Sequence, residues 1–123
     1  MAICRLDPED ESPPWASSAV LSSVTRTQAE TTVVCQEEDV PVGITCNKNW
    51  RCLRIGGVLD FSETGILSSL TALLADDGMP LFALSTYSTD LILIKEEDLF
   101  QAVLALVRSG HRVFSEKGQE WLP

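Results

Sequence analysis

The order of apolar segments between residues 50 and 114 is the feature that most restricts the fold. Two segments within it, 66–74 and 99–107, place apolar residues at helical spacing. Four other segments are apolar and short enough to be strands. They are residues 50–59, 80–86, 91–94 and 111–114. The resulting order β-α-β-β-α-β predicts an α+β, ferredoxin-like fold with both helices on one face of an antiparallel sheet.

Local signals predict where the two helices begin and end. Asp60 or Ser62 is suited to cap the first helix, and Gly78 stands where a helix ends in a left-handed residue. The acidic run 96–98 suits the positive N-terminal end of the second helix, and Gly110 stops it. The polar residues 87–89 predict a turn that joins two strands as a hairpin.

A short internal match indicates a repeat. Residues 32–40, Thr-Val-Val-Cys-Gln-Glu-Glu-Asp-Val, align with residues 91–99, Leu-Ile-Leu-Ile-Lys-Glu-Glu-Asp-Leu. The acidic triplet is identical, and most flanking positions stay apolar in both copies. The match predicts two copies of one βαββαβ unit, the first abbreviated, with helices of only a turn or so. The predicted boundaries are an abbreviated unit at 1–48, a complete unit at 49–115 and a tail at 116–123.

The first copy has weaker signals. Residues 1–6, 20–27 and 31–35 are rich in apolar and β-branched residues and predict strands, with residues 28–30 turning the chain between the last two. Residues 15–18 predict one helical turn after Pro13-Pro14.

The charge balance excludes whole classes of partner. Nine Lys and Arg against eighteen Asp and Glu give a net charge of −9, and the basic residues are scattered. Phosphate backbones require clustered basic residues, so we expect no nucleic-acid binding. No apolar stretch approaches the ~20 residues of a membrane span, and the N-terminal residues run into an acidic segment rather than a signal sequence. We therefore expect a cytoplasmic protein with no membrane contact.

The cysteines and the single histidine give no support for a metal, a cofactor or catalysis. None of the four cysteines lies in a C-x-x-C pair. Cys4, Cys35 and Cys52 occupy apolar contexts that favour buried thiols in a reducing compartment, although disulfides or a thiol acting with His111 remain alternatives. Walker A, G-x-S-x-G and H-E-x-x-H motifs are absent, and neighbouring carboxylates occur only as solvated runs. We expect a protein that is not an enzyme.

Residues 59–70, Leu-Asp-Phe-Ser-Glu-Thr-Gly-Ile-Leu-Ser-Ser-Leu, place a glycine directly before an apolar helix. Residues 73–86 then end that helix with Asp-Asp-Gly and continue into the second strand. In this pattern the segment resembles an ACT domain, the regulatory module named for aspartate kinase, chorismate mutase and prephenate dehydrogenase. Residues 2 to about 114 resemble small stand-alone tandem ACT proteins, which are related to the ACT pair of aspartate kinases and to cytosolic amino-acid sensors.

This resemblance implies a non-enzymatic sensor that binds a free amino acid at the loop between the first strand and the first helix, near a partner ACT unit. The free N–H groups and positive dipole of a helix start suit a ligand carboxylate, and Gly65 permits close approach. Asp60 or Asp90 is the expected partner of the ligand ammonium, and in related sensors the position of Asp90 can face a cationic ligand. The candidate ligand-binding residues are Asp60, Phe61, Ser62, Thr64, Gly65, Ile66, Thr86, Tyr87 and Asp90.

Simpler explanations of these residues stay open. Capping alone accounts for Asp60, Ser62 and Thr64, and a hairpin turn accounts for the polar residues 85–90. We expect a homodimer or a regulatory protein partner. The alternative function is a ligand-free ACT-fold module that serves oligomerisation or protein interaction.

Overall fold

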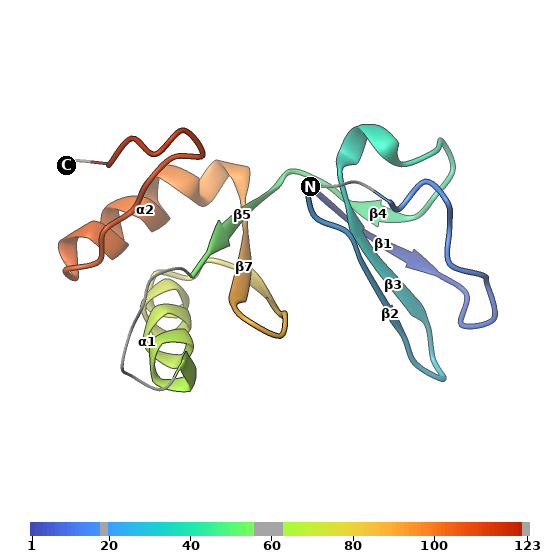
Figure 1. The fold of residues 1–123 in the computed structure, drawn as a ribbon, viewed down its shortest axis with the longest axis horizontal. Helices are drawn as coiled ribbons and strands as arrows, with labels where there is room; N and C mark the ends of the chain where they lie inside the picture. The colour runs from blue at the N-terminus through green and yellow to red at the C-terminus, as the bar shows by residue number, and fades with distance from the viewer. Residues whose placement is uncertain (18–19, 56–62, 122–123) are drawn as a thin grey trace. The chain divides into compact units, whose positions relative to one another are not determined.

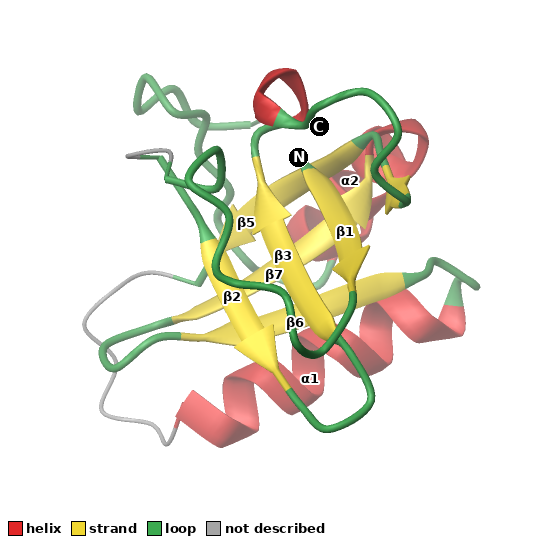
Figure 2. Cartoon of the chain, turned by 90° about the vertical axis from the view of Figure 1, so that its right-hand side faces the viewer, coloured by secondary structure: helices red, strands yellow, loops and turns green. Residues whose placement is uncertain are grey.

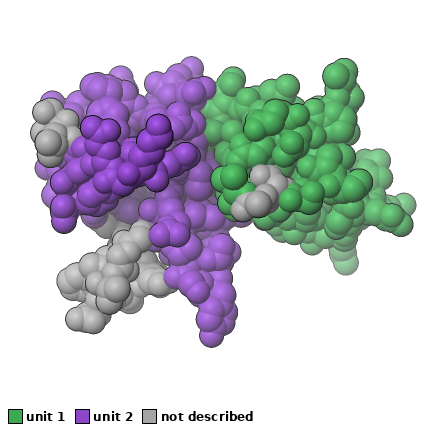
Figure 3. Space-filling model, turned by 45° about the horizontal axis from the view of Figure 1, so that its top comes forward, with its two compact units in different colours: residues 1–50 green, residues 51–123 purple. Residues whose placement is uncertain are grey.

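The chain forms two compact units, Met1–Trp50 and Arg51–Pro123, each with its own sheet (Figure 1, Figure 3). The structure is a computed structural model and describes residues 1–17, 20–55 and 63–121. The fold is mixed α/β and ferredoxin-like, as the sequence pattern predicts.

Unit 1 is built around a four-stranded antiparallel sheet with the order β2-β3-β1-β4 (Figure 2). Its strands are β1 (Ala2–Leu6), β2 (Ser23–Arg26), β3 (Thr31–Cys35) and β4 (Cys46–Asn47). The predicted turn at 28–30 is confirmed, since the Thr27 N–H donates to the Glu30 carbonyl at 2.9 Å. Alternate side chains on one face, with Ala16, form the core: Ala2, Cys4, Val33 and Cys35 are buried.

Unit 2 contains a three-stranded sheet with the order β5-β7-β6, in which β6 and β7 are antiparallel. Its elements are β5 (Trp50–Arg54), α1 (Glu63–Asp76), β6 (Leu81–Ser85), β7 (Asp90–Lys95) and α2 (Leu99–Arg108). The core joins Leu70 and Leu74 of α1, Ile92 and Ile94 of β7, and Leu106 of α2. Because β7 is the central strand, all four of its residues 91–94 are buried, as their continuous apolar run predicts.

The two Glu-Glu-Asp triplets form the same local structure. Each follows a strand and forms a 3-10 turn, η1 (Glu37–Asp39) and η2 (Glu96–Asp98). The copies diverge at the next residue, where Val40 is extended (φ −80°, ψ 121°) and Leu99 is helical (φ −57°, ψ −47°). Pro41 follows Val40, and proline disfavours the helical conformation of the residue before it. The first triplet therefore ends in a single turn, whereas the second continues into α2.

The prediction of a last strand at 111–114 is wrong for the sheet of unit 2. Residues 113–115 pair instead with residues 119–121: Trp121 donates its N–H to Val113 O at 2.7 Å, and Phe114 bridges to Glu120. Gly118 turns the chain with φ +81°, and Trp121 packs edge-on against Phe100 of α2 at 5.6 Å between ring centroids. The Val113 carbonyl and the Ser115 N–H are thus bonded to the C-terminal residues.

Three other predictions need correction. Residues 13–17 form a turn rather than a helix, with the Ala16 N–H donating to Pro13 O at 3.1 Å, and Ser18 lies outside the described residues. The strand predicted at 20–27 is shorter, because its pairing with β3 ends at Ser23. Cys4 and Cys35 are buried as expected, but Cys52 is exposed.

Candidate functional site

The predicted ligand-binding residues fall into three groups. Asp60, Phe61 and Ser62, and residues 56–59 of the predicted strand, lie outside the described residues. Thr64, Gly65 and Ile66 belong to the first turn of α1, which begins at Glu63. Thr86, Tyr87 and Asp90 belong to the hairpin that joins β6 and β7.

The hairpin turn is closed by its own threonines. The Thr86 N–H donates to the Thr89 carbonyl at 2.8 Å, and the Thr86 hydroxyl accepts from the Thr89 N–H at 3.1 Å. Tyr87 is fully exposed at the tip of the turn. The hydroxyl of Thr86 is therefore occupied by the turn, and Tyr87 contributes only an exposed ring.

Asp90 is the first residue of β7 and lies directly opposite Ser85, the last residue of β6. The Ser85 hydroxyl donates a short hydrogen bond of 2.6 Å to Asp90 Oδ1. The Asp90 carboxylate is partly exposed, and this bond engages one of its two oxygens. Ser85 was not among the predicted residues, and only its register opposite Asp90 reveals the contact.

The hairpin is hydrogen-bonded to the end of β5. Ile55, directly after β5, donates its N–H to the Asp90 carbonyl at 3.0 Å, and the Thr89 hydroxyl donates to the Ile55 carbonyl. The last described residue before the gap at 56–62 is therefore bonded to the backbone of Asp90. Sequence reasoning assigned Thr89 to the turn only, because its partner is 34 residues away.

The first turn of α1 points toward the same end of the sheet. The C-terminus of α1 leads through Asp77–Pro80 into the start of β6, with Gly78 at φ +72° making the reversal. Because α1 runs back alongside β6, its N-terminus lies toward the hairpin end of β6 (Figure 2). The fold of unit 2 thus gathers the hairpin, the end of β5 and the helix start at one end of its sheet.

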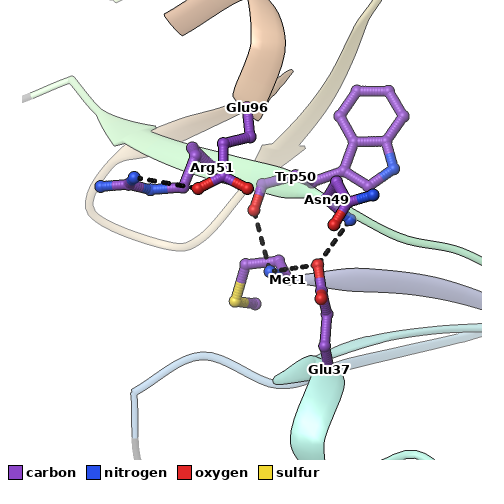
Figure 4. Close-up of polar contacts among 6 residues, drawn as sticks. All are labelled: Met1, Glu37, Asn49, Trp50, Arg51 and Glu96. Atoms are coloured by element: carbon purple, nitrogen blue, oxygen red, sulfur yellow. Dashed lines mark hydrogen bonds and ion pairs between the residues drawn. The ribbon is translucent and has the colours of Figure 1, made fainter.

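Polar contacts of the segment before β5 belong to unit 1 (Figure 4). Glu37 accepts from the Asn49 N–H at 2.5 Å and from the Met1 ammonium at 3.4 Å. Burial of Glu37 acts to raise its pKa, but these donors outweigh burial and hold the pKa below its ordinary value. Asn49 has φ 67°, a left-handed conformation that asparagine tolerates.

In unit 2, Arg51 of β5 lies 3.7 Å from Glu96 (Figure 4). The two side chains are 50% and 59% exposed, and such surface pairs contribute little to stability. Among the described residues there is no group of three or more His, Cys, Asp or Glu side chains arranged to hold a metal ion.

Comparison with known proteins decides the family. A model of the ACT domain matches residues 45–108, which is more than half of the chain. The chain belongs to the ACT-domain family. ACT domains are regulatory rather than catalytic as a rule, and their fold is of a small-molecule-binding type.

Two further comparisons extend over the rest of the chain. A second family model, which describes an N-terminal domain, matches residues 1–43 of this ACT protein. The crystal structure of protein Atu0741 from Agrobacterium tumefaciens superposes with a TM-score of 0.85 at 32% identity, over 89% of this chain and 82% of that one. No curated protein matches the chain. In the part of the chain that the structure describes, no helix has the length and apolar character needed to cross a membrane.

Proposed function

We propose that this ACT protein is a non-enzymatic regulatory protein of the cytoplasm that binds a free amino acid at the loop between β5 and α1. The observation that supports it best is the attachment of the β6–β7 hairpin to Ile55. Through this attachment, Asp90 lies beside the point where the chain leaves β5 on its way to the first turn of α1. The negative Asp90 carboxylate and the positive N-terminal end of α1 thus lie at the same end of the sheet of unit 2.

The two ends of an amino acid match these two elements. The carboxylate is bound by free backbone N–H groups in the first turn of α1, at Thr64, Gly65 and Ile66, where the helix dipole is positive. The ammonium is bound by Asp90, whose carboxylate Ser85 orients. Residues 60–62 are proposed to contact the ligand side chain and so to select among amino acids.

The regulatory step is a change in association. A ligand that binds one associated state more tightly than the other shifts the population toward that state. We propose that the states are a homodimer and its dissociated or partner-bound forms.

Thermal unfolding in the presence of each of the twenty amino acids tests the proposal. The cognate ligand raises the melting temperature in proportion to the logarithm of its concentration, by about 2.7 kcal/mol of stabilisation at one hundred times the dissociation constant. Asp90→Asn weakens binding about ten- to one-hundredfold, because a hydrogen bond to a charged group contributes ~1.5–3 kcal/mol. Asp77→Asn removes the same charge from the turn at the other end of α1 and leaves the affinity unchanged.

Two outcomes would contradict the proposal. One is a folded protein whose melting temperature responds to none of the twenty amino acids at millimolar concentration. The other is equal loss of affinity in Asp90→Asn and Asp77→Asn. If no ligand binds and sedimentation shows stable association that Gly65→Leu does not change, the ACT fold serves oligomerisation alone.

A further inference from the structure

Three of the four cysteines gather on the inner face of the sheet in unit 1. Cys4 of β1 lies directly opposite Cys46 of β4, and Ala2 lies opposite Cys35 of β3. Side chains two residues apart on a strand share a face, so Cys35 lies diagonally across from Cys4. The thiols of Cys35 and Cys46 both act to raise the pKa of the Cys4 thiol. The register therefore brings Cys4 together with two cysteines that lie 31 and 42 positions later in the chain.

The register of β1 and β4 suits a disulfide between Cys4 and Cys46. Arg5 donates its N–H to the Thr45 carbonyl at 2.9 Å, which makes Arg5–Thr45 a hydrogen-bonded pair of the ladder. The neighbouring pair, Cys4–Cys46, is then a non-hydrogen-bonded pair, in which Cα atoms are about 4.5 Å apart and side chains approach most closely. Disulfides form across Cα separations of about 4.4–6.8 Å. A diagonal pair such as Cys4–Cys35 is separated by about 7–8 Å and is outside that range.

The three thiols differ in access to solvent. Cys4 is 1% exposed and Cys35 is completely buried, whereas Cys46 is partly exposed. A reagent in solution therefore meets Cys46 first, and Cys4 is placed to react with whatever is attached to Cys46.

We propose that Cys46 is a thiol-modification site for low-molecular-weight disulfides and that Cys4 converts the adduct into a Cys4–Cys46 disulfide. The Cys46 thiolate attacks one sulfur of the small disulfide R–S–S–R, forming Cys46–S–S–R and releasing R–S⁻. The Cys4 thiolate then attacks Cys46 Sγ, and the second R–S⁻ leaves. Each leaving thiolate takes up a proton, so two protein thiols lose two electrons and two protons and R–S–S–R becomes two R–SH.

The second step is the slow one at neutral pH. Burial, together with the thiols of Cys35 on β3 and Cys46 on β4, raises the pKa of Cys4 to about 12. The reactive thiolate is therefore scarce, and its population grows about tenfold for each unit of pH below that value. Proximity compensates in part, because the attack is intramolecular. The Cys46 adduct accumulates first and closes faster as the pH rises.

Oxidised glutathione and the full-length folded protein test the proposal. After acid quenching and alkylation of free thiols, the intact mass of Cys52→Ser, which lacks the exposed fourth thiol, shows a glutathione adduct first and then a product with two of its three thiols lost and no adduct. Trypsin alone leaves Cys35 and Cys46 in one peptide, so a Glu-specific protease is added to cut between them at Glu37-Glu38. The expected cross-linked peptides contain Cys4 and Cys46, and dithiothreitol separates them.

Variants separate the roles of the thiols. Cys35→Ser and Cys52→Ser retain the cross-link. In the Cys52→Ser background, which lacks the exposed fourth thiol, Cys46→Ser forms neither adduct nor cross-link. The proposal is overturned if folded wild-type protein keeps all four thiols, or stops at the adduct, even at alkaline pH. It is also overturned if the linked peptides contain Cys35 or Cys52. Because the peptide map uses wild-type protein, these outcomes decide the matter even if a variant fails to fold.

Discussion

Replacing Thr89 with valine tests whether the β6–β7 hairpin holds the end of β5 in place. The two side chains have nearly the same shape, so the substitution removes the hydroxyl that donates to the Ile55 carbonyl and little else. The Ile55 N–H still has its bond of 3.0 Å to the Asp90 carbonyl, and the hairpin turn keeps its backbone bond from Thr86 to Thr89. The change therefore removes the one hydroxyl contact between the hairpin and Ile55, together with a longer contact of 3.5 Å from the same hydroxyl to the Asp90 carbonyl.

The expected cost follows from the burial of that contact. A neutral hydrogen bond contributes ~0.5–1.5 kcal/mol, and a fully buried carbonyl left unpaired costs ~1–3 kcal/mol. Because the contact is only partly buried, we expect the free energy of unfolding of unit 2 to fall by about 1–2 kcal/mol. For a domain of this size each kcal/mol corresponds to ~4–8 °C in melting temperature.

Urea denaturation followed by far-UV circular dichroism measures this loss. Both α-helices of the described chain lie in unit 2, so the helical signal reports its unfolding. Hydrogen exchange at the Ile55 amide accelerates in Thr89→Val, since its local support is weakened. Thr25→Val, the same chemical change at an exposed position of β2, shifts stability by less than about 0.5 kcal/mol. A loss in Thr89→Val no larger than in Thr25→Val, with unchanged exchange at Ile55, would refute the reasoning.

Three further predictions concern the core, a helix end and a carboxylate. Leu74→Ala removes a side chain that is 0% exposed and lowers the free energy of unfolding by ~2–5 kcal/mol in the same denaturation assay; a loss below about 1 kcal/mol contradicts its role in the core. Gly78→Ala costs about 1 kcal/mol because φ is +72°, although open space surrounds its Cβ position, so a stabilised variant contradicts this account. The pKa of Glu37 is lowered on folding, so its ionised form stabilises the protein above the ordinary pKa of glutamate, and this contribution disappears as pH falls through the lowered value. Wild-type and Glu37→Gln proteins therefore differ in urea stability at neutral pH and converge in acid; a difference that persists in acid contradicts the assignment.

Much of the fold was predictable because its signals are local. The continuous apolar run 91–94 indicated a central strand, and the Asp-Asp-Gly sequence indicated the end of α1. The duplicated Glu-Glu-Asp triplet predicted two equivalent local structures, η1 and η2. The prediction at 111–114 failed for another reason. The segment pairs with residues 119–121, and no apolar periodicity in the sequence indicates that pairing.

The candidate site divides in the same way. Its helix start could be predicted from Gly65 and the leucines that follow, and α1 does begin at Glu63. The hydroxyl of Ser85 beneath Asp90 and the bond from Thr89 to Ile55 could not, because both depend on strand register and on hairpin placement. The ligand-binding roles of the remaining residues stay predictions.

The sequence by itself determined the order of the elements of unit 2 from β5 to α2, the matching local structure at each Glu-Glu-Asp triplet and the boundaries set by proline and glycine. These features follow from apolar periodicity and from backbone preferences that act within a few residues. Only the tertiary structure decided that Cys46 faces Cys4, that the hairpin is bonded to Ile55 and that the C-terminal residues capture the last predicted strand. Each is a pairing between segments, and its register is selected by the burial of whole faces rather than by any residue's own preference.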